Sequence, residues 1–162
     1  MEKVFISGSA NCNKLDNMVT STIDVMISKN YTILIGDCNG VDSMVQSYLN
    51  EKDYNNVIVY CSGSKCRNLA NSDWQVNHIS VPAGTKGRAF YEVKDIAMSN
   101  DADYGFAVWD GKSVGTWNNV CRMANDNKYV KVFRNDLNKF ETYNENIFKN
   151  TPERNDNYTY DV

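Results

Sequence analysis

The residues best suited to chemistry follow a short apolar run near residue 110. Residues 105–109, Gly-Phe-Ala-Val-Trp, are continuously apolar, as in strands that are buried on both faces. Residues 110–116, Asp-Gly-Lys-Ser-Val-Gly-Thr, then break the strand and lead into a helix. A helix N-terminus carries partial positive charge and unpaired N–H donors, so this turn suits a phosphate or a carboxylate. The alternative is a plain strand–turn–helix connection that Ser113 or Thr116 caps.

Two earlier stretches have the same character. Residues 7–9, Ser-Gly-Ser, end an apolar run, and Gly8 lets a backbone N–H approach a ligand because it has no side chain. Residues 36–42, Gly-Asp-Cys-Asn-Gly-Val-Asp, end another run, and Asp42 can accept hydrogen bonds from ribose hydroxyls. Each feature has a structural alternative, which is a tight turn for Gly8 and a carboxylate favoured by the helix dipole for Asp42.

Strands and helices alternate along the chain that carries these stretches. Apolar residues recur at helical spacing over 15–27, 41–49 and 89–97, and a further helix is expected over 116–125. We expect strands at 4–9 (with its exit loop), 31–35, 57–61, 78–81, 105–109 and 129–133, and a short edge strand at 140–143. This alternation predicts an α/β fold, a Rossmann-like, doubly wound, mostly parallel sheet of about six strands with helices on both faces.

In a doubly wound sheet the polar strand exits meet at one end, where ligands bind beyond the carboxyl ends of the strands. We therefore predict one nucleotide-type site, with hydroxyls and N–H groups on phosphate and Asp37 and Asp42 on ribose. The expected ligand-binding residues are Ser7, Gly8, Ser9, Gly36, Asp37, Asn39, Gly40, Asp42, Trp109, Asp110, Lys112, Ser113, Gly115 and Thr116.

Length and composition set the domain organisation and exclude some classes of partner. The chain has 162 residues and 42% apolar content, enough for one globular domain, expected over 1–145, with a polar, loosely ordered tail over 146–162. The net charge of -3 gives no field that would draw the chain to nucleic acid or anionic lipid. No apolar run approaches the roughly 20 residues that a spanning helix needs, so no membrane partner is expected.

The cysteines predict neither a metal site nor a disulfide. They contain no Cys-x-x-Cys pair and have no histidine nearby, which argues against zinc. Their odd number is typical of reduced thiols in a cytosolic protein. We therefore expect a cytoplasmic protein with no metal, no cofactor and five reduced cysteines, at Cys12, Cys38, Cys61, Cys66 and Cys121.

Other side chains leave alternatives open. There is no Gly-x-Gly-x-x-Gly after the first strand and no Walker A loop. His78 is the only histidine, and its place in an expected strand favours a core or edge residue over a catalyst. Trp109 is either a core side chain or a platform for a base, and Lys112 is either a phosphate partner or a solvated turn residue.

The three polar exits resemble those of the SLOG superfamily, the Rossmann-like group that contains the DNA-processing protein DprA and the LOG phosphoribohydrolases. Its small stand-alone YspA/YpsA-like members show a Gly-Ser-Arg exit, a Gly-Asp-x-x-Gly-x-Asp exit and a late Gly-Thr exit. The corresponding residues here are Gly8-Ser9-Ala10, 36–42 and 109–116, and the resemblance covers about residues 3–135. It implies a nucleotide or nucleotide-derived ligand and a homo-oligomer.

The chain departs from this pattern where chemistry would occur. Ala10 stands where the relatives carry Arg, and Lys94 and Asp95 stand for the Arg and Lys of the LOG helix motif. Asn119 falls at the position of the LOG glutamate, and an amide cannot act as a general acid or base.

These observations predict a protein that binds a nucleotide or nucleotide-derived small molecule, such as a cyclic or ADP-ribose-type messenger, as a sensor or sequestering protein. The alternative is a nucleotide N-glycosidase or phosphoribohydrolase. Asp37, Asp95 or Asp110 would then have to supply the missing carboxylate.

Overall fold

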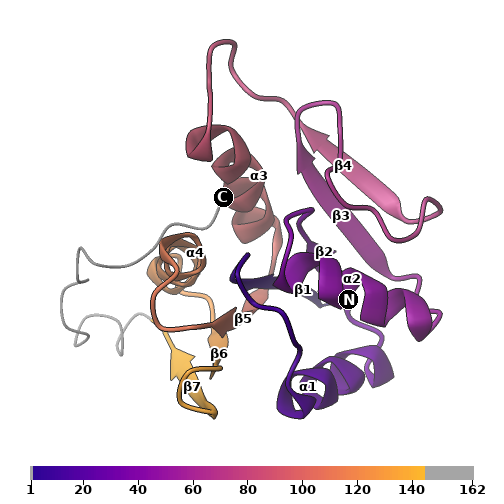
Figure 1. Cartoon of the computed structure of the whole chain (residues 1–162), viewed down its shortest axis with the longest axis vertical. Helices are drawn as coiled ribbons and strands as arrows, with labels where there is room; N and C mark the ends of the chain where they lie inside the picture. The colour runs from indigo at the N-terminus through magenta and orange to yellow at the C-terminus, as the bar shows by residue number, and fades with distance from the viewer. Residues whose placement is uncertain (1, 145–162) are drawn as a thin grey trace.

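The computed structural model describes residues 2–144, which form one seven-stranded sheet between two pairs of helices (Figure 1). The sheet order is β4-β3-β2-β1-β5-β6-β7; β1 to β6 are parallel, and β7 is antiparallel to β6. In chain order the elements are β1 (Lys3–Gly8), α1 (Asn17–Ser28), β2 (Thr32–Ile35), α2 (Val41–Glu51), β3 (Val57–Ser62), β4 (Gln75–Ile79), α3 (Arg88–Asp101), β5 (Tyr104–Trp109), α4 (Val114–Asn125), β6 (Val130–Arg134) and β7 (Lys139–Tyr143).

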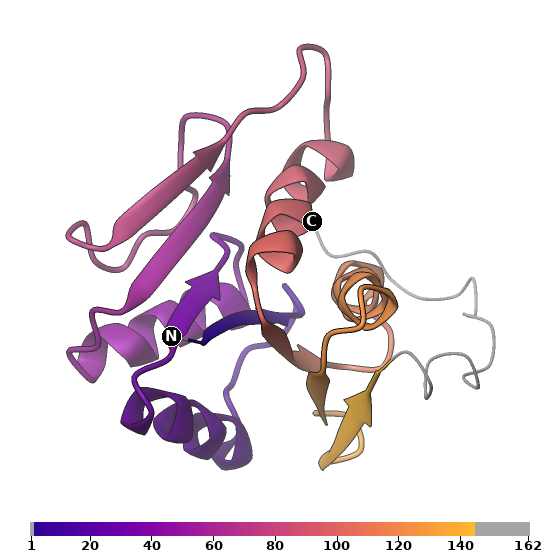
Figure 2. The same ribbon diagram turned by 180° about the vertical axis from the view of Figure 1, so that it is seen from behind.

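Alternation along the central strands divides the core into two layers. In β1, Val4 and Ile6 pack with α1 and α2, whereas Phe5 between them packs with α3 and α4. Because both faces are covered, the central strands are apolar throughout, and all of β2 is buried. The two views from opposite sides show one helix pair on each face of the sheet (Figures 1 and 2). The predicted doubly wound α/β fold is confirmed.

The strand order places a topological switch point between β1 and β5. From β1 the sheet grows through β2 and β3 to β4, and the chain then returns to add β5 on the other side of β1. The connections after β1 and β5 therefore leave in opposite directions and open a crevice at the carboxyl ends of these strands.

The sheet differs from the prediction at its edges. The fourth strand, expected at 78–81, is β4 and begins at Gln75. The alternation of apolar and polar residues did not reveal where β4 begins, because β4 is an edge strand without a buried face and its residues are exposed or half-buried. His78 lies on this strand, and its Nδ1 is 3.1 Å from the carbonyl oxygen of Gly63. The expected edge strand at 140–143 forms as β7.

One prediction about the cysteines is wrong. Cys61 and Cys66 form a disulfide, whereas Cys12, Cys38 and Cys121 are free. The turn after β3 brings the two Cα atoms to 5.2 Å, and the spacing of the residues in the sequence does not reveal that turn. The predicted tail over 146–162 lies outside the described residues. Within residues 2–144, no helix has both the length and the apolar character needed to cross a membrane.

Candidate ligand-binding site

A pocket lies at the switch point, between the end of β1, the first turn of α2, the side of α3 and the start of α4. Its cavity volume is about 50 Å³. The lining residues are Phe5, Ser7, Gly8, Cys38, Asp42, Arg67, Arg88, Tyr91, Glu92, Lys94, Asp95, Met98, Gly115, Thr116 and Asn119.

Charge of both signs is buried in the wall of this pocket. Asp42, in the first turn of α2, is 7% exposed, and Lys94, in the middle of α3, is 4% exposed. The Asp42 carboxylate accepts a hydrogen bond from the Cys38 N–H at 3.1 Å, and the Lys94 ammonium donates to Asp95 at 2.7 Å. This arrangement fixes a carboxylate and an ammonium beside the cavity without solvent around them.

Burial and charge act on these groups in opposite directions. Burial raises the pKa of Asp42 from 3.8 to about 7, although the Lys94 ammonium works against the rise. Burial alone would lower the pKa of Lys94, but the carboxylates of Asp95 and Asp42 raise it above its usual value. Lys94 therefore stays protonated, while Asp42 changes its charge near neutral pH.

A second ion pair positions Arg67 at the pocket. Asp37, 1% exposed, accepts hydrogen bonds from the backbone N–H of Arg67 at 2.8 Å and from its guanidinium at 2.9 Å. The guanidinium lies over the ring of Tyr91, 3.8 Å from its centroid. Asp37 is not in the lining, so it acts on the pocket through Arg67, which is in the lining together with Tyr91.

The first residues after β5, 110–113, have a mainly structural role. Asp110 accepts hydrogen bonds from the backbone N–H groups of Lys112 and Ser113 at 2.9 and 2.7 Å. Ser113 is the N-cap of α4, and its hydroxyl donates to the Ser9 hydroxyl at 2.8 Å. Burial would raise the pKa of Asp110, but these hydrogen bonds lower it overall. The network joins the exits of β1 and β5.

Trp109 is a core side chain and not a platform at the pocket. It is 3% exposed, its Nε1 donates to the Ser113 carbonyl at 2.9 Å, and its ring stacks on Trp117 with centroids 4.8 Å apart. The Arg134 guanidinium lies 4.8 Å from the centroid of the Trp109 ring. These contacts enclose the indole, so it has no exposed face for a base.

The predicted site is therefore partly assembled. Five of the predicted ligand-binding residues line the pocket: Ser7, Gly8, Asp42, Gly115 and Thr116. The other predicted residues are outside its lining: Ser9, Gly36, Asp37, Asn39, Gly40, Trp109, Asp110, Lys112 and Ser113, of which Lys112 is exposed. Gly40 has φ +81°, and a Cβ there would meet the Ser9 carbonyl at 2.4 Å. Asn39 accepts a hydrogen bond from the Asn68 amide at 3.0 Å.

The three carboxylates predicted as catalytic candidates do not all face the pocket. Asp95 is in the lining, whereas Asp37 and Asp110 hold backbone N–H groups elsewhere. Asn119 is in the lining too. Its side-chain oxygen accepts a hydrogen bond from Arg122 at 2.7 Å, and Arg122 also pairs with Glu92 at 2.8 Å.

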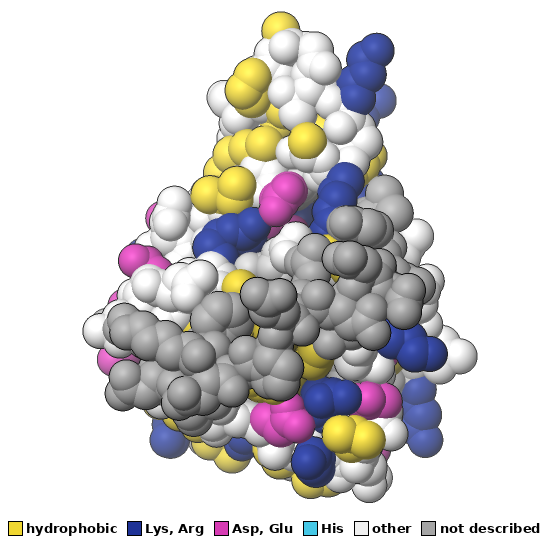
Figure 3. Space-filling model, turned by 90° about the vertical axis from the view of Figure 1, so that its left-hand side faces the viewer, with side chains coloured by type: hydrophobic (Ala, Val, Ile, Leu, Met, Phe, Trp, Pro, Cys, Tyr) yellow, Lys and Arg dark blue, Asp and Glu magenta, His cyan; other side chains and the backbone are white. Residues whose placement is uncertain are grey.

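The sequence did not identify Arg67, Arg88, Tyr91 and Glu92 as site residues. Arg67 lies in the polar loop after β3, where no periodicity showed which side chains turn inward. The others lie in the first two turns of α3, where only the packing of that helix decides which residues face the crevice. Figure 3 shows basic and acidic side chains beside one another on one face of the molecule.

Comparisons with protein-family models, with curated proteins and with solved structures found no match.

Proposed function

We propose that this protein binds a nucleotide-derived small molecule in the switch-point pocket, as a sensor or sequestering protein. One observation carries the proposal: the lining combines three cations, Arg67, Arg88 and Lys94, with the buried carboxylate of Asp42. Guanidinium and ammonium groups suit phosphate oxygens, and a fixed carboxylate suits ribose hydroxyls. Gly115 and Thr116 add the first turn of α4 to the phosphate side.

The size of the cavity limits how the ligand lies. Pockets that enclose a drug-sized ligand usually measure about 300–1,000 Å³, so a cavity of about 50 Å³ takes only part of a nucleotide. We place the sugar-phosphate portion inside and the base at the mouth, near Tyr91 and the Arg67 guanidinium. Binding then requires a small shift of these two side chains.

Membership of the SLOG superfamily is part of this proposal. The polar exits support it, and their residues Gly8, Asp42, Gly115 and Thr116 meet at one pocket. Asn119 supports binding without turnover, because an amide in the place of the catalytic glutamate cannot exchange a proton. We also propose that the protein is a homo-oligomer, which light scattering with and without ligand would test.

A thermal-shift panel of mono-, di- and cyclic nucleotides and ADP-ribose derivatives tests the proposal. A ligand at about one hundred times its Kd should stabilise the protein by about 2.7 kcal/mol. Asp42→Ala should abolish the shift, while Asp73→Asn, an exposed carboxylate outside the pocket, should keep it. If no compound in the panel shifts the melting temperature of the parent protein, the proposal fails.

The N-glycosidase alternative has one observation in its favour. A general acid works best when its pKa is near the working pH, and burial gives Asp42 a pKa of about 7 beside the pocket. Asp95 and Glu92 are further carboxylates in the lining, and Asp95 is the one that the sequence predicts as a catalytic candidate. Incubation with nucleoside monophosphates should then release free base, and both Asp42→Asn and Asp95→Asn should lower the rate. Full activity in both variants would exclude this pair.

A further inference from the structure

We propose that the Cys61–Cys66 disulfide is a thiol-responsive site that holds Arg67 at the pocket, and that reduction by a dithiol releases Arg67. Release of the segment depends only on the disulfide and its neighbours. Its consequence for ligand binding rests on the function proposed above.

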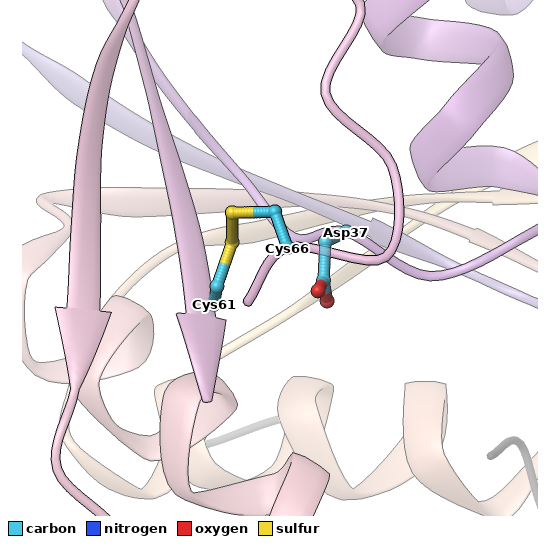
Figure 4. Close-up of side chains that lie close together, drawn as sticks. All are labelled: Asp37, Cys61 and Cys66. Carbon is cyan, nitrogen blue, oxygen red and sulfur yellow. A yellow bond between two sulfur atoms is a disulfide. The ribbon is translucent and has the colours of Figure 1, made fainter. Parts of the chain in front are cut away.

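The disulfide joins a fixed strand to the residue just before Arg67. Cys61 is fully buried in β3, and Cys66 is partly exposed in the loop that follows. Asp37 lies beside the pair, as the close-up shows (Figure 4), with a carboxylate oxygen and both sulfurs within 4.8 Å of one another. The side chain that fixes Arg67 and the bond that fixes Cys66 are therefore neighbours.

Two anchors hold this part of the chain. The disulfide fixes Cys66. The Asp37 carboxylate fixes Arg67 by accepting hydrogen bonds from the backbone N–H and the guanidinium of Arg67, at 2.8 and 2.9 Å. Between Cys61 and Arg67, Ser64 and Lys65 are exposed. Beyond Arg67 the chain is held separately, because Gln46 of α2 accepts the Ala70 N–H at 2.9 Å. Loss of the disulfide removes one of these holds, whereas Arg67 keeps its contacts with Asp37 and the Tyr91 ring, and Gln46 still donates to the Asn68 carbonyl at 3.1 Å.

A dithiol supplies the two electrons and the protons that reduction of the disulfide needs. Its thiolate attacks the sulfur of Cys66, the partly exposed residue of the pair, the Cys61–Cys66 bond breaks, and Cys61 leaves and takes up a proton. The second thiol of the reagent then closes its own disulfide and releases Cys66. Two electrons pass to the protein, which gains two thiols.

The reduced site has an alternative use. Two cysteine sulfurs and the Asp37 carboxylate are a donor set that Zn²⁺ accepts. A bound zinc ion would draw Asp37 away from Arg67 and would fix Cys66 again. Zinc capture is therefore a result that contradicts release, and the test includes an arm with added Zn²⁺ and an arm with a chelator.

Thiol counting on the full chain is the first test. Alkylation of the denatured protein without reductant should label three cysteines, and after treatment with dithiothreitol it should label five. Peptide mapping should place the two additional labels on Cys61 and Cys66. Five labels before reduction would overturn the proposal.

Residue-resolved amide hydrogen exchange by NMR is the second test, and it needs no ligand. With dithiothreitol and a chelator, exchange at the Arg67 amide should accelerate by about tenfold or more, because local opening becomes easier. Ala70, held by Gln46, and the amides of β5 should not change. Equal Arg67 exchange before and after reduction, or protection restored by added Zn²⁺, would overturn the proposal.

Matched variants separate the two anchors. Cys61→Ser/Cys66→Ser should show fast Arg67 exchange without reductant, and Asp37→Asn should show it with the disulfide intact. Cys121→Ser removes a free cysteine and should respond to dithiothreitol like the parent. If the nucleotide panel finds a ligand, reduction should weaken its binding. If it finds none, the exchange result still decides the redox proposal by itself.

Discussion

Lys94 and Asp42 extend from different helices to the same point beside Gly36. A Cβ atom on Gly36 would lie 2.6 Å from Asp42 Oδ2 and 3.2 Å from Lys94 Nζ, so the backbone at the exit of β2 and these two side chains fill the space together. Both side chains are almost fully buried. The electrostatics of the pocket wall therefore depends on how α2 and α3 pack against one residue of the sheet.

The titration of Asp42 should make stability depend on pH. Its pKa is raised from 3.8 to about 7 on folding, so between these values the folded state holds a proton that the unfolded state has lost. The free energy of unfolding should fall as the pH rises through this window, with a slope of up to about 1.4 kcal/mol per pH unit, and level off above it. Urea denaturation from pH 4 to 8 measures this.

Asp42→Asn is the matched control for that measurement. The amide keeps the shape and an acceptor for the Cys38 N–H but does not titrate. The free energy of unfolding of the variant should lack the pH-dependent fall that Asp42 causes. The variant should therefore become increasingly more stable than the parent as the pH rises to about 7. Parallel profiles for the two proteins would mean that Asp42 does not titrate as described.

Thr116→Val should weaken binding of phosphate-containing ligands. Thr116 lines the pocket, and a hydrogen bond from its hydroxyl to a charged ligand group would contribute about 1.5–3 kcal/mol, so the Kd should rise about tenfold or more. The N-cap of α4 is Ser113, so the substitution leaves the cap in place. Titration calorimetry should show the loss, and Thr22→Val on α1 should bind like the parent. Unchanged affinity would mean that the phosphate lies elsewhere.

Asp110→Ala should reduce stability and leave ligand affinity nearly unchanged. The substitution removes the acceptor of the Lys112 and Ser113 N–H groups, and the loss of such hydrogen bonds costs about 1 kcal/mol. The hydrogen bonds lower the pKa of Asp110, so its contribution is present above the unfolded value of 3.8 and is lost as the pH falls further. The cost should shrink in acid.

Asp110→Asn serves as the conservative comparison. Its side-chain oxygen can still accept the same N–H groups, so most of the stability should return. Urea denaturation at pH 7 compares the variants. A large loss of ligand affinity in Asp110→Asn, with stability retained, would contradict the structural role.

Reduction of the disulfide should lower the global stability modestly. A disulfide that closes so short a loop lowers the conformational entropy of the unfolded chain, which stabilises the folded state by about 2 kcal/mol. Urea denaturation with and without dithiothreitol should show this difference, and Cys61→Ser/Cys66→Ser should show none. A shift of the same size in that variant would point to an effect of the reagent outside the disulfide.

The sequence by itself determined the fold and the end of the sheet where a site forms. Buried parallel strands must be apolar on both faces, so residues 105–109 and 31–35 were recognisable, and chain order then places their exits together. Gly8, Asp42 and Thr116 follow from this reasoning because each lies at the end of a strand or in the first turn of the next helix.

The tertiary structure alone decided which polar groups face the pocket and which support it. Asp110 and Ser113 have the same residue types as a phosphate loop, but Asp110 accepts an N–H group of its own turn and the Ser113 hydroxyl donates to Ser9 at the exit of β1. Arg67 reaches the pocket through Asp37, thirty residues away, and Cys61 pairs with Cys66 because the turn after β3 brings them together. Such partners depend on three-dimensional distance, which local residue patterns do not encode.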